Sequence, residues 1–569
     1  MTGESAAPPS AGASAAAADA ADLPYQEIAD RIRDHARRRP TQTALVDGAA
    51  SLDYAGLDAL MDRVAASLQR DGVGEGDAVA ICAASSTRYA ALFLGALRAG
   101  AVVAPLAPSS TAAGFASMLA DAKARLLFVD AAALDALGEN GVGTESTKST
   151  EQPGLVSLDG IAPGVAFDAW LAAPATSPRD VSLSPEAPFN IIYSSGTTGT
   201  PKGIVQSHGM RWSHVFRGGR YAYDDSTVTI LATPLYSNTT LVVFFPTVAF
   251  GGTVVLMAKF DADRYLALAA QHRATHTMLV PVQYRRIMAS PGFGAHDLSS
   301  FRFKFCTSAP FAAELKADIV ARWPGGLIEF YGMTEGGGTC ILAAHEHPSK
   351  LHTVGPPSDG HDIRLIDEAG HELPPGSTGE VVGHSPGMMT GYYGQPEKTR
   401  EAEWFDATGK RFIRTGDVGR FDEDGFLILL DRRKDMIISG GFNLFPSDLE
   451  AVLRTHPDVA DAAVAGVPSE RWGETPAAWV VPRPGSTPDP EALRLWANER
   501  LGKTQRIAFL RLVDELPRSA IGKVLKRELR ERFAADELRG RFAADELRER
   551  SAADAPPEPA AADPSSSAS

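Results

Sequence analysis

A dense run of glycine, hydroxyl and lysine side chains lies between residues 193 and 203, with the sequence Tyr-Ser-Ser-Gly-Thr-Thr-Gly-Thr-Pro-Lys-Gly. It follows the apolar, strand-like run Phe189–Ile192, which a flexible serine–glycine linker would lack. Glycines let the backbone approach a ligand and point several N–H groups one way, and Lys202 adds a charge for a polyphosphate. No Gly-Lys-Ser/Thr follows at the spacing of a Walker A loop, so the run alone predicts phosphate binding. The residues expected to line it are Ser194, Ser195, Gly196, Thr197, Thr198, Gly199 and Lys202.

The same run resembles the phosphate-loop signature of the adenylate-forming superfamily, which includes acyl-CoA and aryl-CoA synthetases, peptide-synthetase adenylation domains and firefly-type luciferases. Further segments resemble other signatures of this superfamily and follow in the same order between residues 25 and 530. Their joint occurrence makes the resemblance specific, because each short motif alone is common. The resemblance implies an enzyme that uses ATP to activate a carboxylic acid as an acyl-AMP and releases pyrophosphate.

The segment Tyr331–Glu335 resembles the second signature of the superfamily. The implied reaction needs a carboxylate that holds Mg²⁺ against the triphosphate, and Glu335 is the candidate. Thr334 is expected to donate to the α-phosphate. Tyr331, followed by Gly332, offers a flat face for adenine.

Two other segments are expected to surround the nucleoside. The stretch Ser308-Ala309-Pro310 resembles the one that lines the other side of the base. The motif that ends in Asp417 resembles the ribose-binding motif, and a carboxylate suits this role because it can accept hydrogen bonds from both ribose hydroxyls. Taken alone, Thr-Gly-Asp is a common turn sequence.

A charged segment, Asp431–Asp435, resembles the hinge of the superfamily, with Asp431 at the position where a glycine is usual. Arg432 matches the arginine that contacts ribose and phosphate. Lys434 matches the pivot about which a small C-terminal domain turns. Exposed charged residues suit a hinge, because its rotation then breaks no hydrophobic core.

The loop Pro517–Lys523 resembles the one that carries the catalytic lysine. The resemblance implies that Lys523 bridges the substrate carboxylate and the α-phosphate during adenylation. A carboxylate that attacks a phosphate brings two anions together, and an ammonium group with Mg²⁺ offsets their repulsion. We interpret Lys526 and Arg527 as the solvated face of the helix that follows.

The segment Met436–Asn443 closely resembles the strand that lines the pantetheine tunnel of acyl- and aryl-CoA ligases. Ser439, Gly440 and Gly441 are expected at this tunnel, which a larger side chain would block, and Trp472 is expected beside the CoA nucleotide. Coenzyme A is therefore the expected acyl acceptor. Two alternatives stay open: an acyl-AMP ligase that loads a separate carrier protein, and a non-catalytic nucleotide-binding protein. A third, luciferase-type oxidation, would require a special luciferin.

Tyr236 and Ser237 occupy the positions where many members carry an aromatic residue and a histidine, so a group often placed beside the acyl carboxylate is missing. Both residues are expected in the acyl pocket. Arg285 and Arg286 belong to a segment expected near this pocket, where an arginine would fit a second carboxylate. Two arginines exposed on a helix are the simpler interpretation. A fatty, alicyclic or aromatic monocarboxylate is therefore the expected substrate.

Composition and charge restrict the class of protein. The net charge of −15 over 569 residues argues against broad contact with nucleic acid. The spacing of Cys82, Cys306 and Cys340 suits neither a zinc site nor a disulfide framework, so we expect reduced, buried thiols. The first 22 residues contain no Lys or Arg, and no apolar run is long enough to span a membrane. A cytoplasmic enzyme without a transmembrane segment is expected.

Alternating strand-like and helix-like segments predict an α/β fold with parallel sheets and crossover helices. Ala78–Cys82 is typical of a buried strand, Tyr89–Arg98 of a helix and Val102–Ala104 of the next strand. The expected organisation is a disordered tail at 1–22, an N-terminal adenylate-forming domain at 23–433 with a β-rich subdomain at about 345–430, a mobile α+β C-terminal domain at 434–532, a duplicated helical extension at 533–550 and a second disordered tail at 551–569.

Two local features of the C-terminal part lead to further expectations. A helix is predicted from Ser447 to Arg454, with Ser447 as its N-cap and Glu450 at the capping-box position. The octapeptide Arg-Phe-Ala-Ala-Asp-Glu-Leu-Arg occurs at 532–539 and again at 541–548. Its composition favours helix, and we assign it no chemical role.

Overall fold

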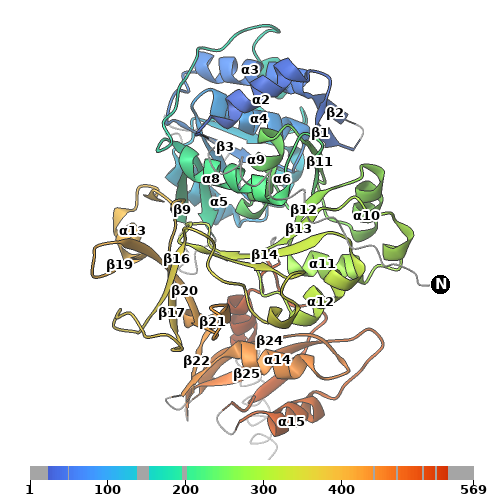
Figure 1. Ribbon diagram of the computed structural model, residues 1–569, viewed down its shortest axis with the longest axis vertical. Coiled ribbons are helices and arrows are strands. Elements are labelled where there is room, and N and C mark those ends of the chain that lie inside the picture. Colours follow the sequence, from blue (N-terminus) through green and yellow to red (C-terminus); the bar gives the residue numbers. More distant parts are fainter. Residues whose placement is uncertain are drawn as a thin grey trace, which may run out of the picture. The chain divides into compact units, whose positions relative to one another are not determined.

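The computed structural model describes residues 24–48, 50–137, 153–194, 202–439, 442–469, 472–502, 505–519 and 522–535 (Figure 1). The predicted tails, most of the predicted repeat extension, Ser195–Gly199 and Gly440–Gly441 lie outside the described residues. The chain divides into two compact units. One comprises Met1–Leu430 with Ala520–Lys523, and the other comprises Asp431–Ser519 with Val524–Ser569.

Two large mixed sheets form the framework of the first unit, and the central strands of each run parallel. All five residues of the run Ala78–Cys82 are buried, as expected of a strand covered by helices on both faces. The first sheet has the order β15 (Thr339–Ala343), β14 (Gly326–Gly332), β13 (Phe303–Cys306), β12 (His276–Leu279), β10 (Val228–Leu231), β11 (Thr253–Leu256), β1 (Thr43–Asp47) and β2 (Ala50–Asp53). The second has the order β18 (Gly391–Tyr392), β9 (Lys202–Ser207), β8 (Pro188–Ser194), β4 (Val102–Pro105), β3 (Ala78–Cys82), β5 (Leu126–Val129), β6 (Gly154–Ser157) and β7 (Val165–Ala166).

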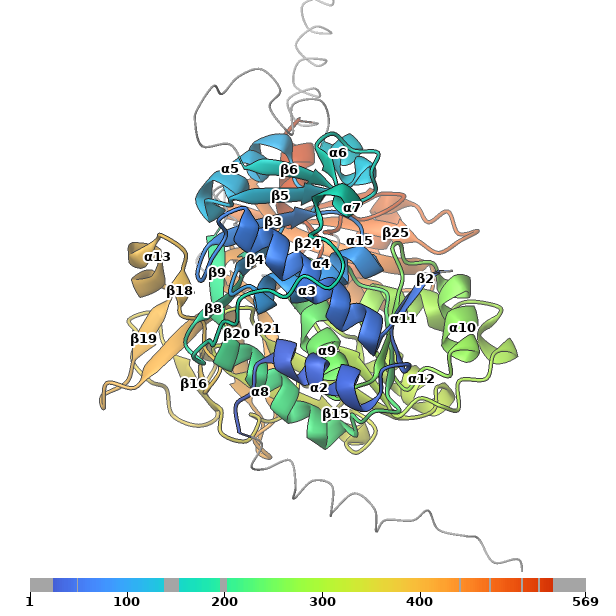
Figure 2. The ribbon, with the colours of Figure 1, turned by 90° about the horizontal axis from the view of Figure 1, so that it is seen from above.

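Helices connect the parallel strands, and this confirms the predicted α/β class. In Figures 1 and 2, α2, α3 and α4 gather at one end of the first unit, where each contacts the other two. The helices are α2 (Ile28–Arg38), α3 (Tyr54–Arg70), α4 (Thr87–Arg98), α5 (Ala112–Ala122), α6 (Ala131–Leu137), α7 (Phe167–Trp170), α8 (His208–Gly218), α9 (Asn238–Ala249), α10 (Ala262–Gln271), α11 (Pro281–Met288), α12 (Ala313–Arg322) and α13 (Pro396–Glu401).

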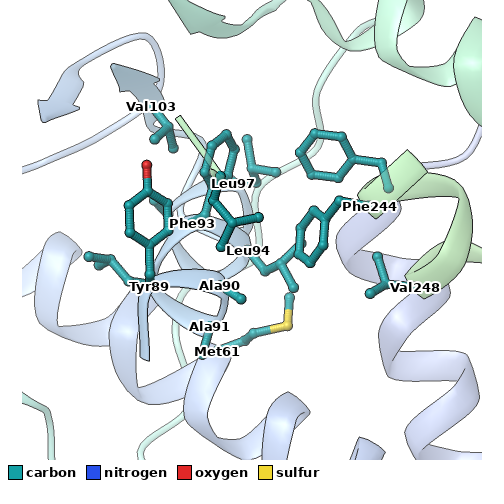
Figure 3. Packing of buried hydrophobic residues seen from close by; sticks show 14 of the residues in the cluster. Met61, Tyr89, Ala90, Ala91, Phe93, Leu94, Leu97, Val103, Phe244 and Val248 are labelled. Carbon is teal, nitrogen blue, oxygen red and sulfur yellow. The ribbon is translucent and has the colours of Figure 1, made fainter. Parts of the chain in front are cut away.

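The largest hydrophobic core forms where α3, α4 and α9 meet (Figure 3). Every residue of α4 except Arg88 is buried, so this helix is covered on nearly all sides rather than along one stripe. Side chains such as Met61, Leu94 and Phe244 fill the space between the three helices.

A smaller antiparallel sheet completes the first unit and occupies the predicted β-rich region. Short strands separated by glycine and proline turns favour such a sheet, because hairpins need tight connections. Its order is β16 (Asp362–Ile366), β17 (Gly379–His384), β20 (Arg411–Phe421) and β19 (Glu403–Phe405), and β21 (Leu427–Arg432) also pairs with β20.

The second unit is an α+β arrangement around one sheet. Leu449 and Leu453 of α14 pack on the sheet residues Val464 and Val480. The strand order is β23 (Phe442–Leu444), β22 (Ile437–Ser439), β25 (Gly473–Pro482) and β24 (Val459–Ser469), with β26 (Phe509–Leu512) parallel to β25, and the helices are α14 (Pro446–Arg454), α15 (Pro490–Arg500) and residues 526–535.

The predicted capping box of α14 is wrong. The helix begins at Pro446, and Phe445 is its N-cap residue, without a side-chain capping bond. The backbone N–H of Ser447 donates to the carboxylate of Asp431 at 3.0 Å. Glu450 instead accepts from the backbone N–H of Val464 at 2.9 Å and forms an ion pair with Lys526 at 3.0 Å. Tertiary partners have therefore replaced the local cap.

Lys526 also differs from its predicted role as part of a solvated helix face. Its side chain is only 15% exposed because it is paired with Glu450. Arg527 is 67% exposed and pairs with Glu531 one helical turn later, so the prediction holds for this residue.

The cysteines are free and buried as expected, and burial raises the pKa of the Cys82 thiol to about 12. Within the described ranges, no helix combines the length and the apolar character needed to cross a membrane.

Replacing Phe244 by alanine should lower the free energy of unfolding of the first unit by about 3–5 kcal/mol, because it opens a cavity in the main core. Urea unfolding followed by circular dichroism measures this change. The matched control is Phe405→Ala on β19, where the ring is 53% exposed and the expected change is within about 0.5 kcal/mol. Equal losses in the two variants would contradict the assignment of the core.

Candidate active site

The β8–β9 hairpin holds both ends of the predicted phosphate loop side by side. The two strands are antiparallel, and Ser194 pairs directly with Lys202. The segment between them therefore leaves and re-enters the sheet at neighbouring positions, as the predicted phosphate loop requires. Of the predicted loop residues, the structure describes the backbone of Ser194 and the whole of Lys202.

Tyr392 joins two of the predicted site residues. It lies on β18 and pairs with Ile204 of β9, which places its ring near the start of that strand. The Lys202 Nζ lies 5.0 Å from the centre of the Tyr392 ring, and the Tyr392 hydroxyl donates to Oε1 of Glu335 at 2.9 Å. The phosphate-loop lysine and the candidate metal carboxylate are thus brought together through one aromatic side chain.

The chemistry of Tyr392 suits this bridging position. Burial, followed by the charge of Glu335, raises the pKa of the Tyr392 hydroxyl above its ordinary value. The hydroxyl therefore stays protonated near neutral pH and donates to the carboxylate. The backbone fixes the same carboxylate residue, since the Met389 N–H donates to the Glu335 carbonyl at 2.8 Å.

The predicted adenine and ribose residues also meet. Tyr331 is the penultimate residue of β14, and its hydroxyl donates to Oδ2 of Asp417 on β20 at 2.9 Å, across 86 residues of sequence. Burial, followed by the charge of Asp417, raises the pKa of the Tyr331 hydroxyl well above its ordinary value. The ring is half-buried, as a surface for a flat ligand requires.

A β-bulge explains how Asp417 leaves the regular strand. Val382 pairs with Arg414 and Glu380 pairs with Val418, so residues 415–417 lie opposite Val381 alone. Gly416 has φ +71°, a left-handed conformation that glycine adopts without strain. The Thr415 hydroxyl donates to the carbonyl of Val381 at 2.8 Å and accepts from the Asp417 N–H at 3.0 Å. Thr-Gly-Asp is here a built motif rather than a simple turn.

The Ser308–Pro310 stretch follows β13, which is the parallel neighbour of β14. The residues that follow β13 and those that follow β14 therefore reach the same edge of the first sheet, where ligands of open α/β sheets bind. Ser308 has φ +81°, which is strained for a residue other than glycine, and its hydroxyl lies 2.6 Å from that of Thr239 in α9. Ala309 and Pro310 follow it directly.

Tyr236 and Ser237 immediately precede α9, so Thr239 connects the predicted acyl segment with the predicted adenine segment. Ser237 is the N-cap residue of α9 but makes no side-chain capping bond, and it is buried. Burial raises the pKa of the Tyr236 hydroxyl. Arg285 and Arg286 are exposed on α11, which favours the simpler of the two interpretations.

The second unit contains other predicted site residues. Ser439 ends β22 and pairs with Gly473, so Trp472 lies at the same edge of that sheet, with 47% of its surface exposed. Arg432 is half-buried and Lys434 is exposed. The Asp431 carboxylate accepts from the N–H groups of Arg432 and Ser447, a role that glycine cannot fill.

Lys523 is half-buried and directly precedes Val524, which pairs with Arg518. The ion pair between Arg518 and Asp461, at 2.6 Å, ties this pair of residues to β24.

Comparison with known proteins decides the family. The family model described as "AMP-binding enzyme" matches residues 32–393, and the model described as "AMP-binding enzyme C-terminal domain" matches residues 448–523. The chain belongs to the AMP-binding enzyme family. This confirms the predicted membership of the adenylate-forming superfamily.

Relatives of this AMP-binding enzyme match it over nearly their whole length. A fatty acid–[acyl-carrier-protein] ligase, ScoC, of Streptomyces coeruleorubidus is 33% identical over 90% of this chain and 97% of its own. A feruloyl-CoA synthase of Amycolatopsis sp is 35% identical over 88% of this chain and 97% of its own. Among solved structures, the amide bond synthetase McbA from Marinactinospora thermotolerans has a TM-score of 0.77 and 30% identity, covering 89% of this chain and 99% of its own.

Sequence reasoning missed Tyr392 in this AMP-binding enzyme. The short run Gly391-Tyr392-Tyr393 carries no motif of its own, and only its pairing with β9 places one of the two rings at the site. A fixed tertiary register, and not residue spacing, selects this residue.

Replacing Tyr392 by phenylalanine should weaken binding of Mg²⁺–ATP about tenfold, because Glu335 loses its donor while the ring near Lys202 remains. Isothermal titration measures the affinity. Binding of AMP, which lacks the outer phosphates, should change little, and the matched control Tyr393→Phe should bind both nucleotides as the wild type does. An equal loss for AMP and ATP would place Glu335 away from the outer phosphates.

Proposed function

We propose that the chain is an AMP-forming acid–CoA ligase. It converts ATP and a carboxylic acid into an acyl-AMP and pyrophosphate, and it then transfers the acyl group to coenzyme A with release of AMP. The observation that carries the proposal is the convergence of Lys202, Tyr392 and Glu335 beside the base of the phosphate loop, with Tyr331 and Asp417 joined nearby in the same unit. Relatives that include a feruloyl-CoA synthase and an indoleacetate–CoA ligase support it.

The nucleotide is bound by charge and shape complementarity. Lys202 and the N–H groups of the loop bind the triphosphate, Asp417 accepts from the ribose hydroxyls and Tyr331 stacks on adenine. Thr334 donates to the α-phosphate, and Ser308-Ala309-Pro310 covers the other side of the base. The Tyr331 hydroxyl already occupies Oδ2 of Asp417, which orients the carboxylate before ribose arrives.

Magnesium would be held by Glu335 together with the triphosphate. Across the described ranges, no three His, Cys, Asp or Glu side chains are arranged to hold a metal on their own. Mg²⁺ commonly uses one or two carboxylates plus substrate phosphates, so the single carboxylate of Glu335 fits. The ion would neutralise charge on the phosphates while the acid attacks.

The acyl acceptor is coenzyme A in this proposal. Ser439, Gly440 and Gly441 line the pantetheine path, and Trp472 contacts the CoA nucleotide. Ile438 of β22 and Trp472, which directly precedes the neighbouring strand β25, are both exposed and offer an apolar edge for this contact. The domain at 434–532 turns about Lys434, with Arg432 beside the nucleotide, between the two half-reactions.

The acid is a fatty, alicyclic or aromatic monocarboxylate. Tyr236 and Ser237 face the acyl group, and Arg285 and Arg286, the candidates for binding a second carboxylate, are exposed on α11. A cytoplasmic location accords with the three free thiols, since reducing compartments keep thiols unpaired.

A screen of pyrophosphate release over a panel of carboxylic acids, with and without CoA, tests the proposal. Acid-dependent pyrophosphate release together with CoA-dependent thioester formation supports a CoA ligase. Release that is indifferent to CoA but yields an acylated phosphopantetheinyl protein would instead support a carrier-protein ligase like the relative ScoC. Tight ATP binding without turnover of any acid would indicate a non-catalytic nucleotide-binding protein.

Replacing Lys523 by alanine should reduce acid-dependent ATP–pyrophosphate exchange at least a hundredfold, because the ammonium between the two reacting anions is lost. The same variant should convert supplied acyl-AMP and CoA to thioester at close to the wild-type rate. Radiolabelled exchange and thioester assays measure the two half-reactions. The control Arg527→Ala, an exposed residue of the following helix, should keep both, and intact exchange in Lys523→Ala would rule out this role.

A further inference from the structure

Arg211 is a fully buried cation on α8, next to the hairpin that holds the phosphate loop. Its Nε donates to Oδ1 of Asn190 on β8 at 2.9 Å, and its Nη2 donates to Oε1 of Gln206 on β9. No carboxylate in the described ranges forms an ion pair with it; the rings of Phe189 and Phe245 lie 5.9 and 5.7 Å from the guanidinium carbon. Burial lowers the pKa of Arg211 to about 9, so the side chain stays charged at neutral pH.

A guanidinium has donors only, and this fixes the orientation of both neighbouring amides. The oxygens of Asn190 and Gln206 must face Arg211, and the Asn190 amide nitrogen then donates to Oε1 of Gln206 at 3.1 Å. The amide nitrogen of Gln206 is left to face the other way. It donates to the backbone carbonyl of Thr334 at 2.7 Å and to Oδ1 of Asn238 at 3.4 Å. The hydrogen bonds thus run in one direction, from the cation to Thr334.

This series of hydrogen bonds ends at the turn that carries Thr334 and Glu335. Gln206 holds the Thr334 carbonyl, Met389 holds the Glu335 carbonyl and Tyr392 holds the Glu335 carboxylate. Three contacts from β9, β18 and the residues just before β18 therefore fix consecutive groups of one turn. Groups that bind a metal and a phosphate must be held to a fraction of an ångström, and such supporting contacts provide that precision.

We propose that Arg211 is a positioning residue for adenylate formation, acting through Gln206 on the Thr334–Glu335 turn. The inference rests on the proposed function, because it assigns the turn to the ATP site. A purely structural role is a poor explanation for this cation. An apolar side chain of similar volume would fill the same space between Phe189 and Phe245 without the cost of burying a charge.

The variant Gln206→Glu distinguishes a positioning role of Arg211 from a purely structural role. The carboxylate still accepts from Arg211 and Asn190, so the buried cation keeps its partners. Both N–H donors are lost, and the Thr334 carbonyl then faces an oxygen. We expect a thermal midpoint within a few degrees of the wild type, an exchange rate at saturating ATP reduced about tenfold or more, and a similarly weaker affinity for Mg²⁺–ATP measured by titration without acid. Wild-type exchange rate and wild-type Mg²⁺–ATP affinity in Gln206→Glu would overturn the inference.

Arg211→Met gives a second, independent test, with Arg98→Met as the matched control. Arg98 is also buried, but it is paired with Asp58 and Asp62 of α3, outside the site. Arg98→Met should lower the thermal midpoint and leave Mg²⁺–ATP affinity per folded molecule unchanged. Arg211→Met should weaken that affinity about tenfold, and Arg211→Lys should restore only part of it, since an ammonium lacks the planar fork. If Arg211→Met behaves like the control, the inference is wrong.

The two hypotheses fail in different ways. If the wild type shows no acid-dependent exchange, the proposed function fails, while Mg²⁺–ATP binding by Gln206→Glu and Arg211→Met still tests the positioning role. If Arg211→Met does not fold, Gln206→Glu decides the question.

Discussion

The hydrogen bond between Tyr392 and Glu335 is the contact on which the arrangement of the proposed site depends. A carboxylate close to an ammonium group tends to form an ion pair with it, because direct contact lowers the electrostatic energy. Such an ion pair would occupy both groups before a ligand arrives. The tyrosine gives the carboxylate a neutral donor and gives Lys202 an aromatic ring at 5.0 Å. The Glu335 carboxylate and the Lys202 ammonium therefore lie in one site with the Tyr392 side chain between them, and this is the arrangement on which the proposed binding of a polyphosphate and its metal rests.

The framework around this contact uses the direction of its strands. Parallel strands such as β13 and β14 place the residues that follow them at one sheet edge. The antiparallel β8–β9 hairpin and β18 bring the phosphate loop to the same unit. The bulge in β20 adds a carboxylate from a different sheet, and the Tyr331 hydroxyl joins the two sheets at that point. Lys202, Tyr331 and Asp417 are carried by strands, which limits their movement.

Local patterns predicted much of the fold. The buried run Ala78–Cys82, the helix around Tyr89–Arg98 and the β-rich region appear as expected, because each depends on nearby residue types. The capping box of α14 failed because Asp431, 16 residues upstream, takes the Ser447 amide. Glu450 and Lys526 form an ion pair that no local pattern indicates.

In the candidate site, too, local patterns predicted some residues, while others depend on tertiary contacts. Motifs identified Lys202, Tyr331, Glu335 and Asp417, and the structure brings these residues together in pairs or through one side chain. Tyr392, Gln206 and Arg211 could not be found from spacing, since their roles depend on which strands pair and on which direction an amide faces. The chemistry of a site is visible in residue types, whereas the contacts that hold it in place depend on tertiary register.

The bulge at Thr415–Asp417 has a consequence for how this site can evolve. Three residues there lie opposite one, so the inward and outward alternation of side chains stays in phase on both flanks, with Phe412 and Ile413 buried before the bulge and Val418 after it. A single-residue insertion or deletion would put one flank out of phase and turn its core side chains toward water. Substitutions around the carboxylate of Asp417 therefore leave the sheet intact, whereas a change in the length of this segment does not.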